Sequence, residues 1–290
     1  MIVSPFLYAQ KNIGGIPYSF GKELNIVNIK SNTTPEIALA KLDMQQIMTE
    51  DEYYDNSSGL QLFRYGIPVK VNLNLENSGK WLTLENGYRI WILKIYCPDA
   101  TSININYDRF WIPKGAVLYI YDKNNTSFIG GFNEENNQGT HEFPSKFATG
   151  LIYDDVIFLE YFEPKEVMNE SVISIADIIY GYRDVRGFGD APCSVNINCS
   201  PEGDNWQKEK KSVAKVLMNG VGCSGSMINN TRNDGTPYFL TCNHFLTSAN
   251  VNLDAINNPD ASYCMFFWNY ESSGCEDGDD FILPLLLVLL

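Results

Sequence analysis

Hydrophobic and polar residues alternate along the middle of the chain. The apolar positions are Val69, Val71, Leu73 and Leu75, and the polar ones are Lys70, Asn72, Asn74 and Glu76. A period of two is typical of a strand with one buried face. Further segments rich in β-branched and aromatic residues are separated by Asn, Gly, Asp and Pro turns, and they cover 88–96, 102–107, 116–121, 156–162 and 172–179. With little helix between them, these strands predict an all-β fold, in which residues 68–182 form an antiparallel, jelly-roll-like β-sandwich.

A helical pattern precedes this domain. Thr34, Pro35 and Glu36 supply an N-cap, a first-turn proline and an acid that complements the helix dipole. Apolar residues then follow at roughly helical spacing, at Ile37, Leu39, Leu42, Ile47 and Met48. Acidic residues and the polar stretch 56–59 end the pattern. We therefore expect residues 1–67 to be a leader with one helix that begins at Thr34.

The composition changes after residue 180. Glycine, arginine and proline are frequent over 183–192, which predicts an exposed linker. Six cysteines lie beyond residue 190, whereas Cys97 is the only one before it. Strand patterns recur over 212–217, 223–228, 238–241 and 263–270. Residues 193–290 are thus expected to form a second β domain.

Charge and cysteine content narrow the class of protein. The chain has 21 Lys and Arg against 35 Asp and Glu, a formal net charge of -14. A phosphate backbone or an anionic membrane would be repelled, so we expect no nucleic acid and no membrane as partner. The apolar tail over 281–290 is shorter than the roughly 20 residues of a spanning helix. Clustered cysteines favour structural disulfides and a secreted, extracellular protein, although residues 1–10 match at most a shortened signal peptide.

The most informative motif begins at Cys223. It has the sequence Cys-Ser-Gly-Ser-Met-Ile-Asn-Asn-Thr over 223–231 and ends as Tyr-Phe-Leu-Thr-Cys-Asn-His over 238–244. These residues resemble the lysyl endopeptidase-like branch of trypsin-fold serine endopeptidases. There, a Cys-Thr-Gly-Ser-Leu-type strand is followed by Asn-Asn-Thr and by a Tyr-Phe-Leu-Thr-Ala-x-His-Cys segment. The resemblance extends to 193–203 and 268–275, and it implies that residues 193–290 are the first part of a trypsin-like β-barrel, incomplete in this chain.

The resemblance gives His244 the role of catalytic general base. An imidazole with a pKa near 6.5 can take a proton from a serine and return it to the leaving amine. An isolated histidine is more often a surface or core residue, and the surrounding motif is what favours catalysis here.

The other triad members are harder to place. A triad also needs an acid and a serine nucleophile, yet no Gly-x-Ser-Gly segment follows residue 245. Ser224 is a weak candidate for the nucleophile, because it precedes the histidine at a place where the family has a structural strand. Asp280 lies in an Asp-Phe segment similar to the acid-bearing strand of the family.

The resemblance also implies a disulfide pattern. Cys199 and Cys275 would form one family disulfide, and Cys193 would lack its partner. Cys223 would normally pair with the residue just after the catalytic histidine, which is Phe245 in this chain.

Either Cys242 or Cys264 could replace the missing disulfide partner of Cys223, and the sequence spacing does not decide between them. A zinc site built from Cys223, Cys242, His244 and Cys264 is an alternative, although no C-x₂-C pair is present. We expect no metal and no cofactor.

The first domain resembles the pro-regions of related secreted precursors, in Trp91, 112–115, 160–161 and 182–183. This implies a zymogen whose N-terminal domain is a propeptide. Cleavage between Arg186 and Gly187 would then release the protease domain.

Together these features predict the N-terminal fragment of a secreted serine endopeptidase precursor that cuts peptide or protein substrates with a His/Asp/Ser triad. Because only His244 of the triad is evident, we expect this chain itself to be inactive. The apolar run over 285–290 favours an interruption of the chain after about Asp277. The alternative is a secreted β-sandwich binding or adhesion module with a degenerate protease remnant. Its sugar- or peptide-binding surface would carry aromatic residues such as Trp81, Trp91, Trp111 and Tyr121.

Overall fold

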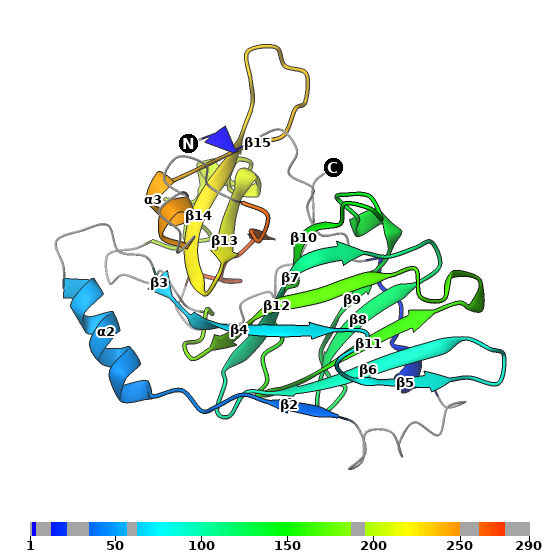
Figure 1. Ribbon diagram of the computed structural model, residues 1–290. Helices are drawn as coiled ribbons and strands as arrows, with labels where there is room; N and C mark the ends of the chain where they lie inside the picture. Colours follow the sequence, from blue (N-terminus) through cyan, green and yellow to red (C-terminus); the bar gives the residue numbers. More distant parts are fainter. Residues whose placement is uncertain are drawn as a thin grey trace. The chain divides into compact units, whose positions relative to one another are not determined.

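The computed structural model describes residues 2–3, 13–21, 35–56, 63–186, 195–249 and 261–275. The chain divides into two compact units. We call the first the cysteine-rich unit, which comprises Met1–Ala9, Ser58–Gly66 and Arg183–Leu290. We call the second the sandwich unit, which comprises Gln10–Ser57 and Ile67–Tyr182. Most of their elements are strands (Figure 1), and the prediction of an all-β fold is confirmed.

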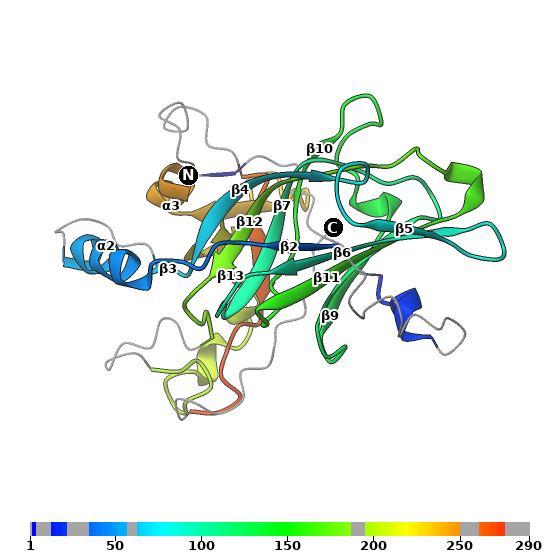
Figure 2. The same ribbon diagram turned by 60° about the horizontal axis from the view of Figure 1, so that its bottom comes forward.

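Two sheets form the sandwich unit (Figure 2). The first has the order β10-β7-β12-β4, with strands Ser145–Ala148, Ser102–Trp111, Val172–Gly181 and Gly66–Asn74. The second has the order β2-β6-β11-β8-β9, with strands Glu36–Ala38, Arg89–Tyr96, Val156–Glu163, Val117–Asp122 and Phe128–Phe132, and β5 (Lys80–Thr83) also pairs with β6. Strands β6, β11, β8 and β9 are antiparallel neighbours, as are β10, β7 and β12.

The core of this unit follows from the period of two. On β6, Trp91, Leu93 and Ile95 are fully buried and pack with residues of β7 and β12 from the other sheet. The Trp91 indole nitrogen donates to the Ser78 carbonyl at 2.7 Å, which satisfies its polar group inside the core. Burial of this alternating face supplies the main free energy that holds the two sheets together.

The predicted helix at Thr34 is wrong in its position. Glu36–Ala38 forms β2, which pairs in parallel with β6, and the helix α2 spans only Met44–Asn56. The helix begins after Asp43, whose carboxylate accepts the backbone N–H groups of Gln45 and Gln46 at 3.1 Å. The apolar residues before it, Ile37, Leu39 and Leu42, pack instead against the sandwich core. Tertiary packing along β6 therefore outweighs the local capping signal.

The second sheet also has an apolar outer face. Its buried residues are Ile90, Ile92, Tyr119, Tyr121, Phe158 and Phe162. A short 3-10 helix, Tyr18–Phe20, lies on this face, with Tyr18 stacked on Phe162 at 4.0 Å. Under it lies the buried carboxyl of Glu160, which accepts Ser19 N–H at 3.2 Å and Tyr121 O–H at 3.2 Å.

Because of the buried Glu160 carboxyl, we expect the free energy of unfolding to depend on pH. Burial raises the pKa of Glu160, and the hydrogen bonds from Ser19 and Tyr121 offset that rise only in part. Because the folded-state pKa lies above the unfolded one, the stabilisation is complete at low pH and is lost as the pH rises through the raised pKa. Urea unfolding at pH 4.5 and 8 should show a smaller loss of stability for Glu160→Gln than for the wild type. Equal losses in the two proteins would contradict this assignment.

The cysteine-rich unit contains one open sheet. Its order is β1-β15-β14-β13-β16, with strands Ile2–Val3, Tyr238–Thr241, Val221–Ile228, Val213–Met218 and Met265–Trp268, and β3 (Phe63–Arg64) pairs with β14. The helix α3 spans Asn243–Ala249, and the short 3-10 helices η4 and η5 span Asp204–Trp206 and Glu209–Ser212. Over the described ranges, β1 and β16 are the two ends of the sheet, so no closed barrel is formed.

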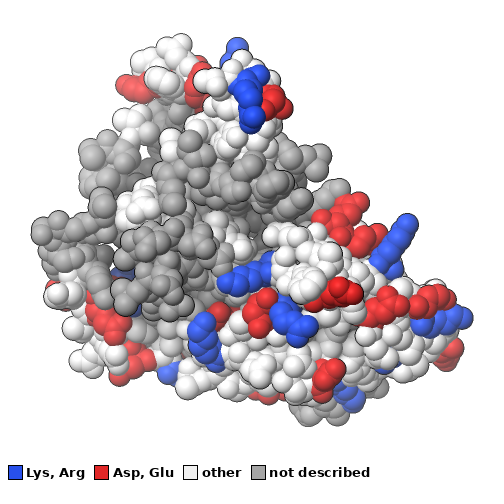
Figure 3. Space-filling model, turned by 45° about the horizontal axis from the view of Figure 1, so that its top comes forward, with Lys and Arg blue, Asp and Glu red and all other residues white. Residues whose placement is uncertain are grey.

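Some of the residues named in the sequence predictions lie outside the residues that the structure describes. They are Thr34, Gly187, Cys193, Asp280 and the tail 285–290. None of the helices that the structure does describe combines the length and apolar character needed to cross a bilayer. Among the described residues on the face drawn in Figure 3, acidic and basic side chains are interspersed.

Candidate active site

His244 is the second residue of α3, which is separated from the end of β15 by the single residue Cys242. The next two side chains, Phe245 and Leu246, are buried and anchor the start of the helix in the core of the unit. The position that holds a cysteine in the resembling family therefore carries a core phenylalanine here. His244 itself is half-buried, and its Nε2 lies 3.3 Å from the sulfur of Cys242.

Two thiols meet beside this imidazole. The sulfur of Cys223, on β14, lies 3.0 Å from that of Cys242. Burial, and then the neighbouring Cys242 thiol, raise the pKa of Cys223 to about 11. Cys264, by contrast, places its sulfur 3.6 Å from that of Met218. Of the two candidate partners for Cys223, the structure brings Cys242 to it. Among the described residues, no three His, Cys, Asp or Glu side chains are grouped so that they could hold a metal ion, so the four residues of the hypothetical zinc site are not assembled.

Ser224 faces away from the histidine. Successive strand residues point to opposite faces of a sheet, so Ser224 projects opposite to Cys223. In the register of β13 and β14 it is paired with Lys215, and it lines a cleft of about 410 Å³ together with Trp206 and Tyr270. This geometry argues against Ser224 as the nucleophile for His244.

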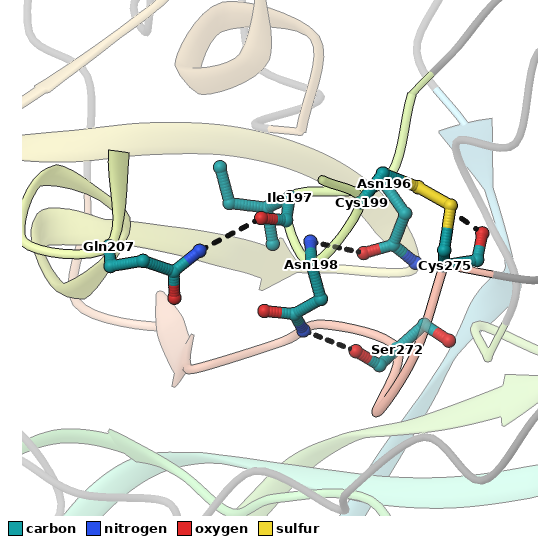
Figure 4. The surroundings of a disulfide bond; sticks show 7 residues. All are labelled: Asn196, Ile197, Asn198, Cys199, Gln207, Ser272 and Cys275. Atoms are coloured by element: carbon teal, nitrogen blue, oxygen red, sulfur yellow. Dashed lines mark hydrogen bonds between the residues drawn. A yellow bond between two sulfur atoms is a disulfide. The ribbon is translucent and has the colours of Figure 1, made fainter. Parts of the chain in front are cut away.

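The predicted disulfide between Cys199 and Cys275 is present in the structure, with a Cα–Cα distance of 4.5 Å. It joins the loop before β13 to the loop after β16 (Figure 4). The Asn198 amide donates to the Ser272 carbonyl at 2.6 Å across the same junction. Lys210 adds an ion pair to Glu271 at 2.8 Å. The two loops are thus joined by a covalent bond and by polar contacts.

A buried cation was missed by the sequence reasoning. Lys215 is only 6% exposed, and its ammonium donates to the carbonyl of Val185 and lies 4.1 Å from the centre of the Tyr270 ring. The sequence feature that could have indicated a buried lysine is its position within the otherwise apolar strand Val213–Met218. Buried charges need such partners, because an unpaired one costs several kcal/mol.

The aromatic residues of the alternative hypothesis are largely internal. Trp91 and Tyr121 are fully buried, and the Trp81 ring is half-buried below the guanidinium of Arg89 at 4.3 Å. Trp111, in edge contact with His141, is half-buried as well.

Residues 188–282 match the family model of the lysyl endopeptidase C-terminal domain. This region is therefore similar to the C-terminal domain of lysyl endopeptidases. The match covers the motif from Cys223 to His244 and both cysteines of the disulfide, and it confirms the lysyl endopeptidase-like relationship for about the last third of the chain.

Proposed function

We propose that the chain is the N-terminal part of a secreted serine endopeptidase precursor in which His244 acts as the catalytic general base. The observation that carries this proposal is the family match over 188–282, which includes a half-buried histidine at the start of α3. In this role the imidazole accepts the proton of a serine hydroxyl during attack on a peptide carbonyl. It then returns the proton to the departing amine.

The anchoring of α3 supports this role. Phe245 and Leu246 fix the first turn of the helix in the core, so the imidazole is held on a rigid element. The proposal assigns neither the nucleophile nor the triad acid to a residue of the described ranges. We therefore propose that residues 1–290 alone do not hydrolyse peptide bonds, and that residues 1–186 serve as a pro-region.

Hydrolysis of a fluorescent casein substrate tests this function. The product of the complete gene should cleave casein after processing near Arg186, whereas a protein of residues 1–290 should not. If the complete product binds peptides or glycans and cleaves none, the binding-module alternative replaces this proposal.

If the protein is secreted, a separate prediction follows for the thiols of Cys223 and Cys242. In an oxidising compartment, Cys223 and Cys242 should form a disulfide, because their sulfurs already lie 3.0 Å apart. Each thiol loses one proton and the pair gives two electrons to a low-molecular-weight disulfide, which is reduced to two thiols. Peptide mapping of the non-reduced secreted protein should recover this cross-link. A link from Cys223 to Cys264, or two free thiols, would contradict it.

A further inference from the structure

Segments from upstream of the linker form part of the cysteine-rich unit. Strand β1 (Ile2–Val3) pairs with β15, and β3 (Phe63–Arg64) pairs with β14. Beyond β3, the N–H groups of Tyr65 and Gly66 both donate to the carbonyl of Gly220, at 2.7 and 3.1 Å. These segments supply backbone partners to strands that would otherwise present open edges.

The turn between β13 and β14 fits this upstream segment. Gly220 has a positive φ of 85°, and a Cβ added there would collide with the Gly66 carbonyl. Glycine at this position therefore serves the turn conformation and also the close approach of the two backbones.

A second segment, 183–186, lies at the start of the predicted linker and is held at Val185, so the linker is not exposed at this residue as expected. The Val185 side chain is 2% exposed, and its carbonyl accepts the Tyr270 hydroxyl at 2.6 Å as well as the Lys215 ammonium. Lys215 and Tyr270 come from β13 and from the residues after β16, and we call the two side chains the Val185 clamp. The clamp grips one specific carbonyl with a charged donor and a neutral donor.

Charge interactions and backbone hydrogen bonds also hold residues 183–186 in the position that places Val185 in the clamp. Asp184 and Arg186 form an ion pair at 2.6 Å. Burial alone would raise the pKa of Asp184, but hydrogen bonds from Arg186 and the charge of Lys215 lower it. Arg183 N–H donates to the Tyr65 carbonyl at 3.1 Å, so the two segments also bind each other.

We propose that the cysteine-rich unit carries a docking site for the ends of its own pro-region, with residues 63–66 bound along β14 and Val185 bound in the clamp. The proposal rests on the proposed function, because it treats residues 1–186 as a pro-region. Cleavage after Arg186 then yields a non-covalent complex and not a free protease domain. Release requires a second cut upstream, or displacement of the docked segments.

The test uses the full chain with a recognition sequence for a site-specific protease inserted between Arg186 and Gly187. After cutting, the two fragments should co-elute in size-exclusion chromatography at micromolar concentration. Fragment exchange with a tagged N-terminal fragment then gives the dissociation constant. Tyr270→Phe should raise it about fivefold, the effect of one neutral hydrogen bond, and Lys215→Met about 10- to 100-fold. Lys211→Met, at an exposed position four residues away, is the matched control and should leave it unchanged.

Separate elution of the wild-type fragments would overturn the proposal. So would equal dissociation constants for Tyr270→Phe and the Lys211→Met control, and Tyr270→Phe keeps this comparison valid if Lys215→Met fails to fold. Because an added protease makes the cut, the result does not depend on peptidase activity. Failure of the complete gene product to hydrolyse casein, with intact docking of these fragments, would contradict only the proposed function.

Discussion

Replacing Cys199 with Ser is expected to lower the free energy of unfolding of the cysteine-rich unit by about 4 kcal/mol. The disulfide to Cys275 spans a sequence separation of 76 residues, and closing so long a loop strongly restricts the unfolded chain. The polar contacts of Asn198 and Lys210 across the same junction become weaker when the covalent link is lost. Few other single changes in this unit should cost as much.

Hydrogen exchange of peptides from β13 and β16 measures this loss within the unit itself. Cys264→Ser is the matched control, because Cys264 belongs to the same unit and is not part of a disulfide in the structure, and the change should alter protection little. A loss below about 1 kcal/mol for Cys199→Ser would mean that the polar contacts alone hold the two loops.

Replacing His244 with Ala is expected to lower kcat by about 10⁶-fold in a gene product that hydrolyses peptides. The serine nucleophile would lose the base that activates it, whereas substrate binding and KM should change little. The variant should fold, because Phe245 and Leu246 provide the buried contacts of the helix start.

His141→Ala provides the control for this prediction. His141 is the other histidine of the chain, and it contacts Trp111 in the sandwich unit. Its replacement should leave kcat within about twofold. Comparable activity in the two variants would show that His244 is not the base.

Strands with clear alternation could be predicted from the sequence. The patterns at 69–75, 156–162 and 238–241 match β4, β11 and β15 closely. Strand β9 (Phe128–Phe132) was missed because Gly130 and Gly131 indicate a turn. Both have positive φ and lie where a Cβ would clash with a neighbouring carbonyl, so the strand uses them for close backbone approach.

The candidate site could be predicted only in part. The motif places Cys242 two residues before His244, and the turn from β15 into α3 brings their side chains together. The choice between Cys242 and Cys264 as the neighbour of Cys223 required the sheet register. The clamp was missed because Val185, Lys215 and Tyr270 meet only through tertiary folding, at sequence separations of 30 and 85.

The most direct test of the account is fluorophosphonate labelling of the complete gene product, followed by mapping of the labelled serine. We predict one labelled serine, different from Ser224, and labelling that is slowed at least about 10³-fold in His244→Ala. Label on Ser224, equal rates in both proteins, or no label at all would contradict the claim that His244 serves a serine endopeptidase.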